Sequence, residues 1–362
     1  MLKQQKIFFD FLRFCIGSAK EIPGSLKEAD WKELYAIAKK QCLVGVLFDG
    51  IKKLPAEYVG MKKELLLQWM AESQMLEKAN VRLNDAAIQV SEWFRKKGFR
   101  TCILKGQGNA LMYPNPYSRT PGDIDIWVEG GDKRVISFVR SISPHEKACY
   151  HHIDFPSYKG VEVEVHYRPS FLLCFWHNRK LQKYYERVQE EQFSHRVMLG
   201  EQGKIVIPTA EFNLIFQLTH IFTHLMNEGI GLRQLLDYYY VISMLSVNCE
   251  MLTSLQKELK ELGLWKFAGA IMYIMHEVFG MPASRLIVPP NEKYGKFVLN
   301  EVLEAGNFGR HDARNRFGRS KLGHNLQRVY RDMRLVTYFP AEALCEPIFR
   351  VWHFFWRMKN KK

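Results

Sequence analysis

Two acidic residues in the middle of the chain could hold a divalent cation. In DIDIW, Asp123 and Asp125 are two residues apart within a run that is typical of a β-strand, so both carboxylates should point to the same face. Two carboxylates on one face repel each other, and a cation between them keeps both ionised. Magnesium prefers such oxygen ligands. The spacing therefore predicts a Mg²⁺ site on this strand.

A second strand candidate supplies a third acid. In VEVEVHY, the valines alternate with Glu162, Glu164 and His166, so these polar residues share the face opposite the valines. Transfer at a phosphate needs an in-line nucleophile and neutralised phosphate oxygens, and usually two metals bridged by shared carboxylates. Taken singly, each of these polar residues is better explained by a solvated strand face. The order and spacing of all the acids together favour phosphate chemistry.

Cationic and glycine residues that suit a phosphate lie upstream of these acids. The segment LKGQGNAL brings Lys105, Gly106, Gln107 and Gly108 between an expected strand and an expected helix. Backbone N–H groups in such a turn are free to receive phosphate. Arg119, on the proline-rich loop before Asp123, could offer a planar fork of donors to a triphosphate.

The block from Ile103 to Pro169 resembles a known family, the uncharacterised nucleotidyltransferases of the polymerase-beta-like superfamily, which are related to abortive-infection toxin nucleotidyltransferases. The resemblance rests on LKG, R-x-x-x-DID, HH and VEVHYRP. It implies a polymerase-beta-like palm with an NTP as substrate and Mg²⁺ or Mn²⁺ as cofactor. It further implies Asp123, Asp125 and Glu164 as catalytic metal ligands, with Glu164 preferred because it forms an E-x-H motif with His166.

The turn departs from the glycine and serine that are common in the superfamily, because this chain has Lys105, Gly106, Gln107 and Gly108 there. This departure motivates an alternative function, a catalytically inactive module that binds a nucleotide or nucleic acid on the same fold. For the enzyme, the acceptor of the nucleoside monophosphate stays open among RNA, protein and a small molecule.

A helical block after the palm is also similar to the family, in which a histidine pair and an R-x-x-x-D motif occur. Here these residues are His220, His224, Arg233 and Asp237. We expect Arg233 and Asp237 to border the nucleotide cleft, although an intrahelical ion pair would also explain their spacing. His220 and His224 share one helical face, and a core or supporting role is favoured over a metal site because H-E-x-x-H is absent.

A histidine pair also precedes the expected strand HIDF. Residues in a strand alternate between its two faces. His151 and His152 should therefore face opposite sides, so that at most one of them reaches the cleft.

Apolar periodicity predicts the elements that position these residues. Residues 6 to 97 have helical spacing, short apolar runs follow Gly98, and long helical patterns return from Thr209. The fold class is therefore α+β, a small mixed sheet with helices flanked on both sides by helical regions. The expected regions are an N-terminal helical region (1–97), a nucleotidyltransferase palm (98–208) and a C-terminal helical region (209–362).

Composition narrows the class of protein and its partners. The 362 residues are 47% hydrophobic and carry a formal net charge of +14, which favours a folded protein with an anionic partner such as a nucleotide or nucleic acid. The seven cysteines form no C-x-x-C pair, a pattern expected of reduced thiols. With neither a membrane span nor a signal peptide recognisable, a cytoplasmic location is expected.

The C-terminal part of the chain is basic and aromatic. The arginines between Arg310 and Arg334 would suit RNA or another anionic acceptor, although a solvated basic face explains them equally well. The last segment, IFRVWHFFWRMKNKK, would permit peripheral contact with an anionic membrane. An aromatic helix that closes the core is the preferred interpretation of that segment.

Overall fold

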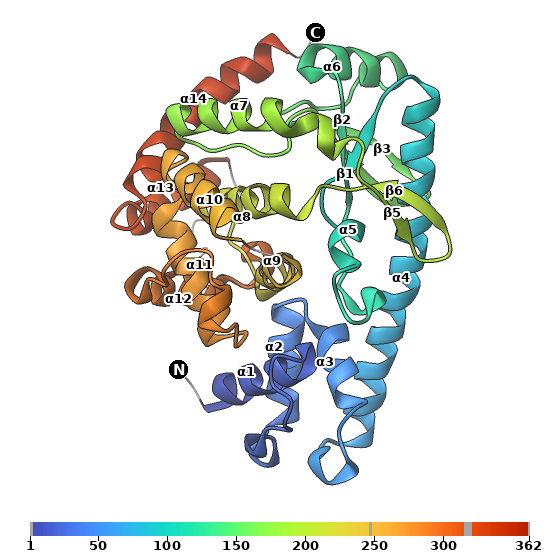
Figure 1. Ribbon diagram of the computed structural model, residues 1–362, viewed down its shortest axis with the longest axis vertical. Coiled ribbons are helices and arrows are strands. Elements are labelled where there is room, and N and C mark those ends of the chain that lie inside the picture. Colours follow the sequence, from blue (N-terminus) through green and yellow to red (C-terminus); the bar gives the residue numbers. More distant parts are fainter. Residues whose placement is uncertain (1–2, 246–247, 315–320, 361–362) are drawn as a thin grey trace.

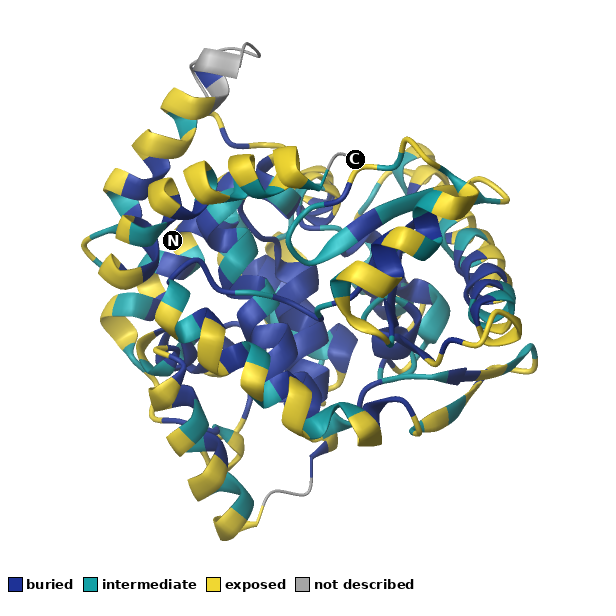
Figure 2. Cartoon of the chain, turned by 90° about the horizontal axis from the view of Figure 1, so that it is seen from above, coloured by how far each residue is buried: buried dark blue, intermediate teal, exposed yellow. Residues whose placement is uncertain are grey.

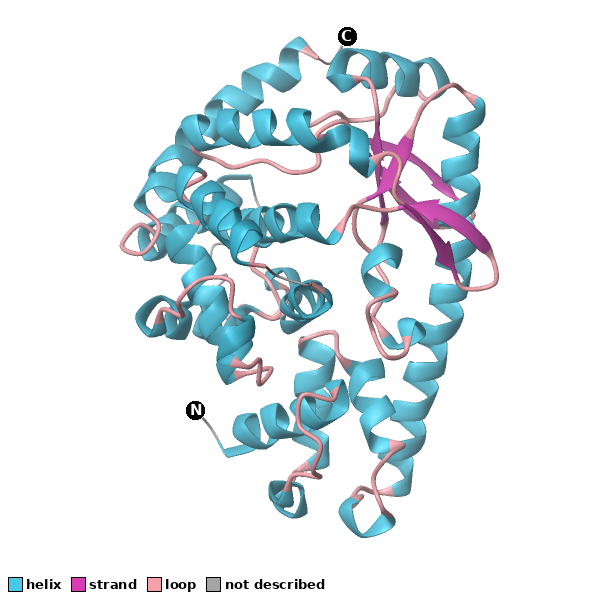
Figure 3. Cartoon of the chain, viewed as in Figure 1, coloured by secondary structure: helices cyan, strands magenta, loops and turns pink. Residues whose placement is uncertain are grey.

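The computed structural model of the protein describes residues 3–245, 248–314 and 321–360. Figure 3 shows that the strands gather on one side of the molecule and that helices fill the rest. Chain order places this small sheet between an N-terminal and a C-terminal set of helices. The predicted α+β fold class is confirmed.

The N-terminal part of the chain consists of helices, as expected. The α-helices are α1 (Lys3–Ile16), α2 (Trp31–Lys40), α3 (Val44–Ile51) and α4 (Lys63–Lys96). Helix α4 contains 34 residues and follows one edge of the molecule in Figure 1. Trp69 near its start donates a 2.9 Å hydrogen bond to the carbonyl of Val44, whereas Phe94 near its end packs into the core beside the sheet. Gly98 then adopts a positive φ of 82°, which ends the helix and turns the chain into the first strand.

The main sheet has four strands in the order β1-β2-β4-β3. The strands are β1 (Thr101–Ile103), β2 (Ile124–Val128), β3 (His152–Tyr158) and β4 (Val161–His166). The central pair, β2 and β4, is parallel, and both outer pairings are antiparallel. In the central pair Asp125 lies opposite Glu164. This register brings together acids that are far apart in the sequence.

Alternation along the strands separates an apolar face from a polar one. Ile124 and Ile126 of β2 join Val163 and Val165 of β4 in a core that includes Phe94 of α4. Asp125 points to the other face, as the alternating pattern predicted. The sheet is thus closed by α4 on one side and leaves its acidic face toward the rest of the protein.

Shorter elements surround the sheet. They are α5 (Gln107–Ala110), α6 (Gly131–Ile142), α7 (Phe175–Gln192), β5 (Arg196–Leu199) and β6 (Gly203–Val206). Strands β5 and β6 form an antiparallel hairpin, which the sequence did not lead us to expect because its alternation is short and mostly polar. Helix α5, the helix expected after the turn, is only four residues long.

The C-terminal part is helical. Its helices are α8 (Ala210–Asn227), α9 (Leu232–Met244), α10 (Cys249–Glu261), α11 (Trp265–Glu277), α12 (Glu292–Ala305), α13 (Lys321–Leu335) and α14 (Pro340–Lys359). Most residues of α8 and α9 are buried, in keeping with the dark centre of the molecule in Figure 2. One hydrophobic core joins these helices to α1–α3. The division of the chain at residues 98 and 209 stays a prediction.

Helix α14 closes the core only in part. Phe349 is buried and stacks on Phe171 at 5.2 Å between ring centroids. Other apolar side chains of the helix are exposed, among them Leu344, Ile348, Val351, Phe354, Phe355 and Met358. No helix in the described part of the chain is both long and apolar enough to span a bilayer. Peripheral membrane contact through α14 stays a prediction.

Candidate active site

The three predicted acids converge in space. Asp123 lies directly before β2, Asp125 lies within it, and Glu164 is opposite Asp125 on β4. One carboxylate oxygen from each acid lies within 4.8 Å of the other two. Parallel pairing of β2 and β4 produces this cluster, because it brings both polar faces to the same side. The donors are all carboxylate oxygens, a set that suits Mg²⁺ or Mn²⁺.

Mutual repulsion and burial perturb the acids. The negative charge of Asp125, together with burial, raises the pKa of Asp123 to about 6. Burial would also raise the pKa of Asp125, but Lys105 and a hydrogen bond from His166 outweigh burial and lower that pKa. His166 lies 3.0 Å from Asp125 Oδ1 and 3.4 Å from Glu164 Oε2 through its Nε2 atom. The His166 imidazole therefore links Asp125 of β2 to Glu164 of β4.

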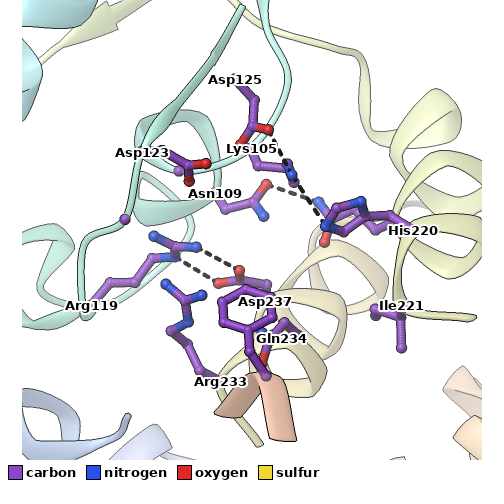
Figure 4. A pocket seen from close by; sticks show the side chains of 14 residues that line it. Lys105, Asn109, Arg119, Asp123, Asp125, His220, Ile221, Arg233, Gln234 and Asp237 are labelled. Atoms are coloured by element: carbon purple, nitrogen blue, oxygen red, sulfur yellow. Dashed lines mark hydrogen bonds and ion pairs between the residues drawn. The ribbon is translucent and has the colours of Figure 1, made fainter. Parts of the chain in front are cut away.

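The ammonium group of Lys105 contacts the acidic cluster and does not project from an open turn. Its Nζ atom lies 2.8 Å from Asp125 Oδ1 and 3.1 Å from His220 Nε2. Burial and the nearby Lys105 charge hold the pKa of His220 well below its usual range, so the neutral ring can accept a hydrogen bond from the lysine. This contact with Lys105 agrees with the supporting role expected for His220. Figure 4 shows Lys105 between Asp125 and His220.

Two residues of the predicted turn differ in whether they face the pocket. Gly106 has a φ of 56°, a conformation that favours glycine, and it lines the pocket shown in Figure 4. The side chain of Gln107 instead is buried and donates a hydrogen bond to Asn84 of α4. Gln107 can therefore face a nucleotide only through its backbone.

Arg119 and Asp237 form a buried ion pair. Both guanidinium contacts are 2.8 Å long, and the side chains are only 4% and 7% exposed. Tyr113 adds a 2.7 Å hydrogen bond to the same carboxylate. Asp237 thus pairs with a loop residue 118 positions away rather than with Arg233. Asp237 engages the Nε and Nη2 donors of Arg119, and contact between Arg119 and a triphosphate stays a prediction.

Arg233 also lines the pocket shown in Figure 4. Its Nη1 atom donates to the carbonyl of Thr120 at 3.0 Å, and its buried Nε atom has no hydrogen-bond partner within the described residues. Burial and the neighbouring Arg119 lower the pKa of Arg233. A buried guanidinium with an unused donor favours an anion nearby.

Two pockets adjoin at the acids. The first, here called the arginine pocket, is lined by Arg119, Asp123, Arg233 and Asp237 among others (Figure 4). The second, here called the histidine pocket, has a volume of about 420 Å³. Its lining includes Glu164, His151, His152, His166, His220, His224, His353, Arg328, Arg350 and Arg357. Lys105, Asp123, His220 and Phe308 belong to both pockets.

The expectation that at most one of His151 and His152 reaches the cleft is wrong. Both line the histidine pocket, because His151 precedes β3 and does not follow the alternation of a strand. Both rings also approach Cys149, with Sγ 3.6 Å from His151 Nδ1 and 3.4 Å from His152 Nδ1. Sequence reasoning did not single out Cys149; the run CYHH was the available signal.

Two arginines of the basic stretch are paired with an acid inside the protein. Arg314 and Arg334 pair with Glu301, and Arg331 donates to the carbonyl of Asn227. Arg316 and Arg319 lie outside the described residues. Arg328 reaches the histidine pocket, so the local positive charge lies beside the acids as well as on the surface.

The protein thus has a small mixed sheet, three carboxylates on its polar face and a cationic pocket beside them. Residues 27–280 match the family described as uncharacterised nucleotidyltransferase, and the chain belongs to this family. The resemblance found in the sequence is thereby confirmed.

Comparison with solved structures finds an antigenic nucleotidyltransferase-like protein from Paracoccidioides brasiliensis. It is 15% identical, with a TM-score of 0.29, and the match covers 52% of this chain and 89% of that chain. Among curated proteins, none matches this chain.

Proposed function

We propose that the protein is a nucleotidyltransferase that transfers a nucleoside monophosphate from an NTP to an acceptor, with Mg²⁺ or Mn²⁺ held by Asp123, Asp125 and Glu164. The observation that carries the proposal is the convergence of these carboxylates within 4.8 Å at the junction of two pockets. The raised pKa of Asp123 reflects charge repulsion that a divalent cation would relieve. A bound metal would neutralise phosphate oxygens and orient the attacking group.

The arginine pocket suits the triphosphate. Arg233 and Lys105 both line this pocket and bring two cations close to the acids. Asp237 and Arg119 hold each other and thereby form the pocket wall. Gly106 lies next to the acids, since a Cβ atom there would be in ordinary contact with the Asp123 carbonyl at 3.6 Å.

The histidine pocket suits the acceptor. Arg328 of α13 and Arg350 and Arg357 of α14 line this pocket and supply positive charge, which favours an anionic acceptor such as RNA. An acceptor oxygen bonds to the α-phosphorus while the bond from that phosphorus to pyrophosphate breaks. Glu164 faces this pocket, where it orients the acceptor hydroxyl and accepts its proton. The seven cysteines are free thiols, which suits a cytoplasmic enzyme.

Label transfer tests the proposal with a matched pair of variants. The purified protein is incubated with α-labelled NTPs, Mg²⁺ and cellular RNA, protein or small-molecule fractions. Glu164→Gln should lower transfer about 100-fold or more, whereas Glu162→Gln on the same strand should keep it, because Glu162 is exposed and outside the cluster. Equal activity of the two variants would refute the assigned role of Glu164.

A non-catalytic nucleotide-binding module is the second candidate. The ion pair between Lys105 and Asp125 favours it, because the lysine already neutralises a carboxylate that a metal would use. Such a module should be stabilised by NTP without Mg²⁺, and Asp123→Asn should leave that stabilisation unchanged. Thermal-shift measurements with and without Mg²⁺ distinguish the candidates, since the enzyme requires both the metal and Asp123 for tight NTP binding.

A further inference from the structure

A cysteine and two histidines meet beside the acidic cluster without being part of it. Cys149, His151 and His152 lie in the segment that leads into β3, and each of them offers one donor atom within 4.8 Å of the other two. The Cys149 Sγ atom lies 3.6 Å from His151 Nδ1 and 3.4 Å from His152 Nδ1. The proposed transfer reaction uses none of these three side chains.

These separations fit a tetrahedral metal ion. Zinc bonds to sulfur at about 2.3 Å and to imidazole nitrogen at about 2.0–2.1 Å, and tetrahedral angles then place sulfur and nitrogen donors about 3.5 Å apart. We propose that Cys149, His151 and His152 bind a zinc-like divalent cation, separate from the cation assigned to Asp123, Asp125 and Glu164. The mixed sulfur and nitrogen donors favour zinc over magnesium.

The surroundings hold the donors in the required orientation. His152 Nε2 lies 3.6 Å from Asp154 Oδ1, so a carboxylate orients the ring from the side opposite the donor Nδ1, as at many metal-bound histidines. The backbone N–H of Cys149 donates to the carbonyl of His152 at 2.9 Å. Tyr167 donates to the carbonyls of both Cys149 and His152, which ties this loop to the end of β4.

Of the other donor groups nearby, Glu164 is assigned to the other cation, although it also groups with His152 and His166. His166 Nε2 is engaged by Asp125 at 3.0 Å, so it is not available to complete the set. A comparable group of Cys174, His177 and Glu342 is saturated, because Glu342 Oε2 accepts 2.7 Å and 2.9 Å bonds from the N–H groups of Leu173 and Cys174. The cluster at Cys149 is therefore the better metal site of the two.

The proposed ion would lie at the wall of the histidine pocket. His151 and His152 both line the histidine pocket, and His152 Nδ1 lies 3.4 Å from Glu164 Oε2. Three protein ligands leave the fourth position of a tetrahedral ion for water or for an anionic group that enters this pocket. This proposal does not depend on nucleotidyl transfer, since an inactive module would bind the ion equally well.

Cobalt substitution tests the site directly. The full-length protein is treated with a chelator, reconstituted with Co²⁺ and examined by absorption spectroscopy. We expect one tightly bound Co²⁺ per chain, tetrahedral visible bands and a near-ultraviolet thiolate-to-cobalt band, all displaced by Zn²⁺. Cys149→Ser should abolish the thiolate band, and Asp154→Asn should weaken metal affinity about 10- to 100-fold.

Two control variants make the outcome decisive. Cys174→Ser should keep the thiolate band, because it alters the other cluster, and Asp123→Asn should keep it even if transfer activity is lost. His151→Asn provides a second test of the site should Cys149→Ser fold poorly, and it should lower affinity while the folded far-ultraviolet spectrum is retained. Absence of a thiolate band in the wild-type protein, or its persistence in Cys149→Ser, overturns the proposal.

Discussion

The buried pair of Arg119 and Asp237 allows a sharp test of whether these residues brace the site or bind the nucleotide. We consider Asp237→Asn, which keeps the volume of the side chain and removes its charge. Both residues are less than a tenth exposed, and Arg233 lies next to the same carboxylate. The variant leaves two buried guanidinium groups without their common anion.

The expected loss of stability is large. Removing one partner of a buried pair destabilises a protein by about 3–5 kcal/mol. For 362 residues, an unfolding entropy of about 2.1 cal/mol/K per residue corresponds to about 0.8 kcal/mol/K. The midpoint of thermal unfolding should therefore fall by about 4–7 °C.

Differential scanning calorimetry measures this change, with Glu258→Gln as the matched control. Glu258 pairs with Arg187 at 2.9 Å, but Arg187 is 63% exposed, so the control should lose less than about 1 kcal/mol. NTP binding is measured in parallel well below the melting temperature. If Asp237→Asn melts like the wild type but no longer binds NTP, the bracing role is refuted and Asp237 serves the ligand.

Three further predictions concern other parts of the molecule. Lys105→Met should enlarge the thermal stabilisation by Mg²⁺, because the acids lose the ammonium group 2.8 Å from Asp125; an unchanged Mg²⁺ shift in calorimetry would contradict competition between lysine and metal. Burial and the charge of Glu346 raise the pKa of Asp332 to about 7, so its contribution to stability is present below about pH 4 and is lost as pH rises through about 7. Asp332→Asn should therefore be more stable than the wild type at pH 8 but not at pH 4, and equal melting differences at both pH values would disprove this. Gly45→Ala should destabilise the protein by about 1–3 kcal/mol in urea unfolding, because a Cβ atom there would lie 2.3 Å from a backbone oxygen; wild-type stability would show that the loop yields.

Local spacing was sufficient to predict the long helices and the strands of the main sheet and to put the acids on its polar face, but it did not predict the β5–β6 hairpin. A strand repeats every two residues, so the alternation in VEVEV correctly separated Val163 and Val165, now in the core, from Glu164 on the polar face. The long helix ending near Gly98 was predictable because it lacks proline and has helical periodicity. These features depend on neighbours in the sequence, which is why the sequence alone determined them.

Tertiary structure decided the partners of the charged groups. The same spacing allowed Asp237 to pair with Arg233, yet the fold supplies Arg119, from 118 positions away, in a fully buried contact. It also placed Lys105 on Asp125 and gathered Cys149 with two histidines. Such contacts depend on how strands and helices pack. A charge that is removed from water pairs with whichever opposite charge the fold brings near it. The sequence therefore determined which side chains could do chemistry, and the fold determined which of them remain free to do it.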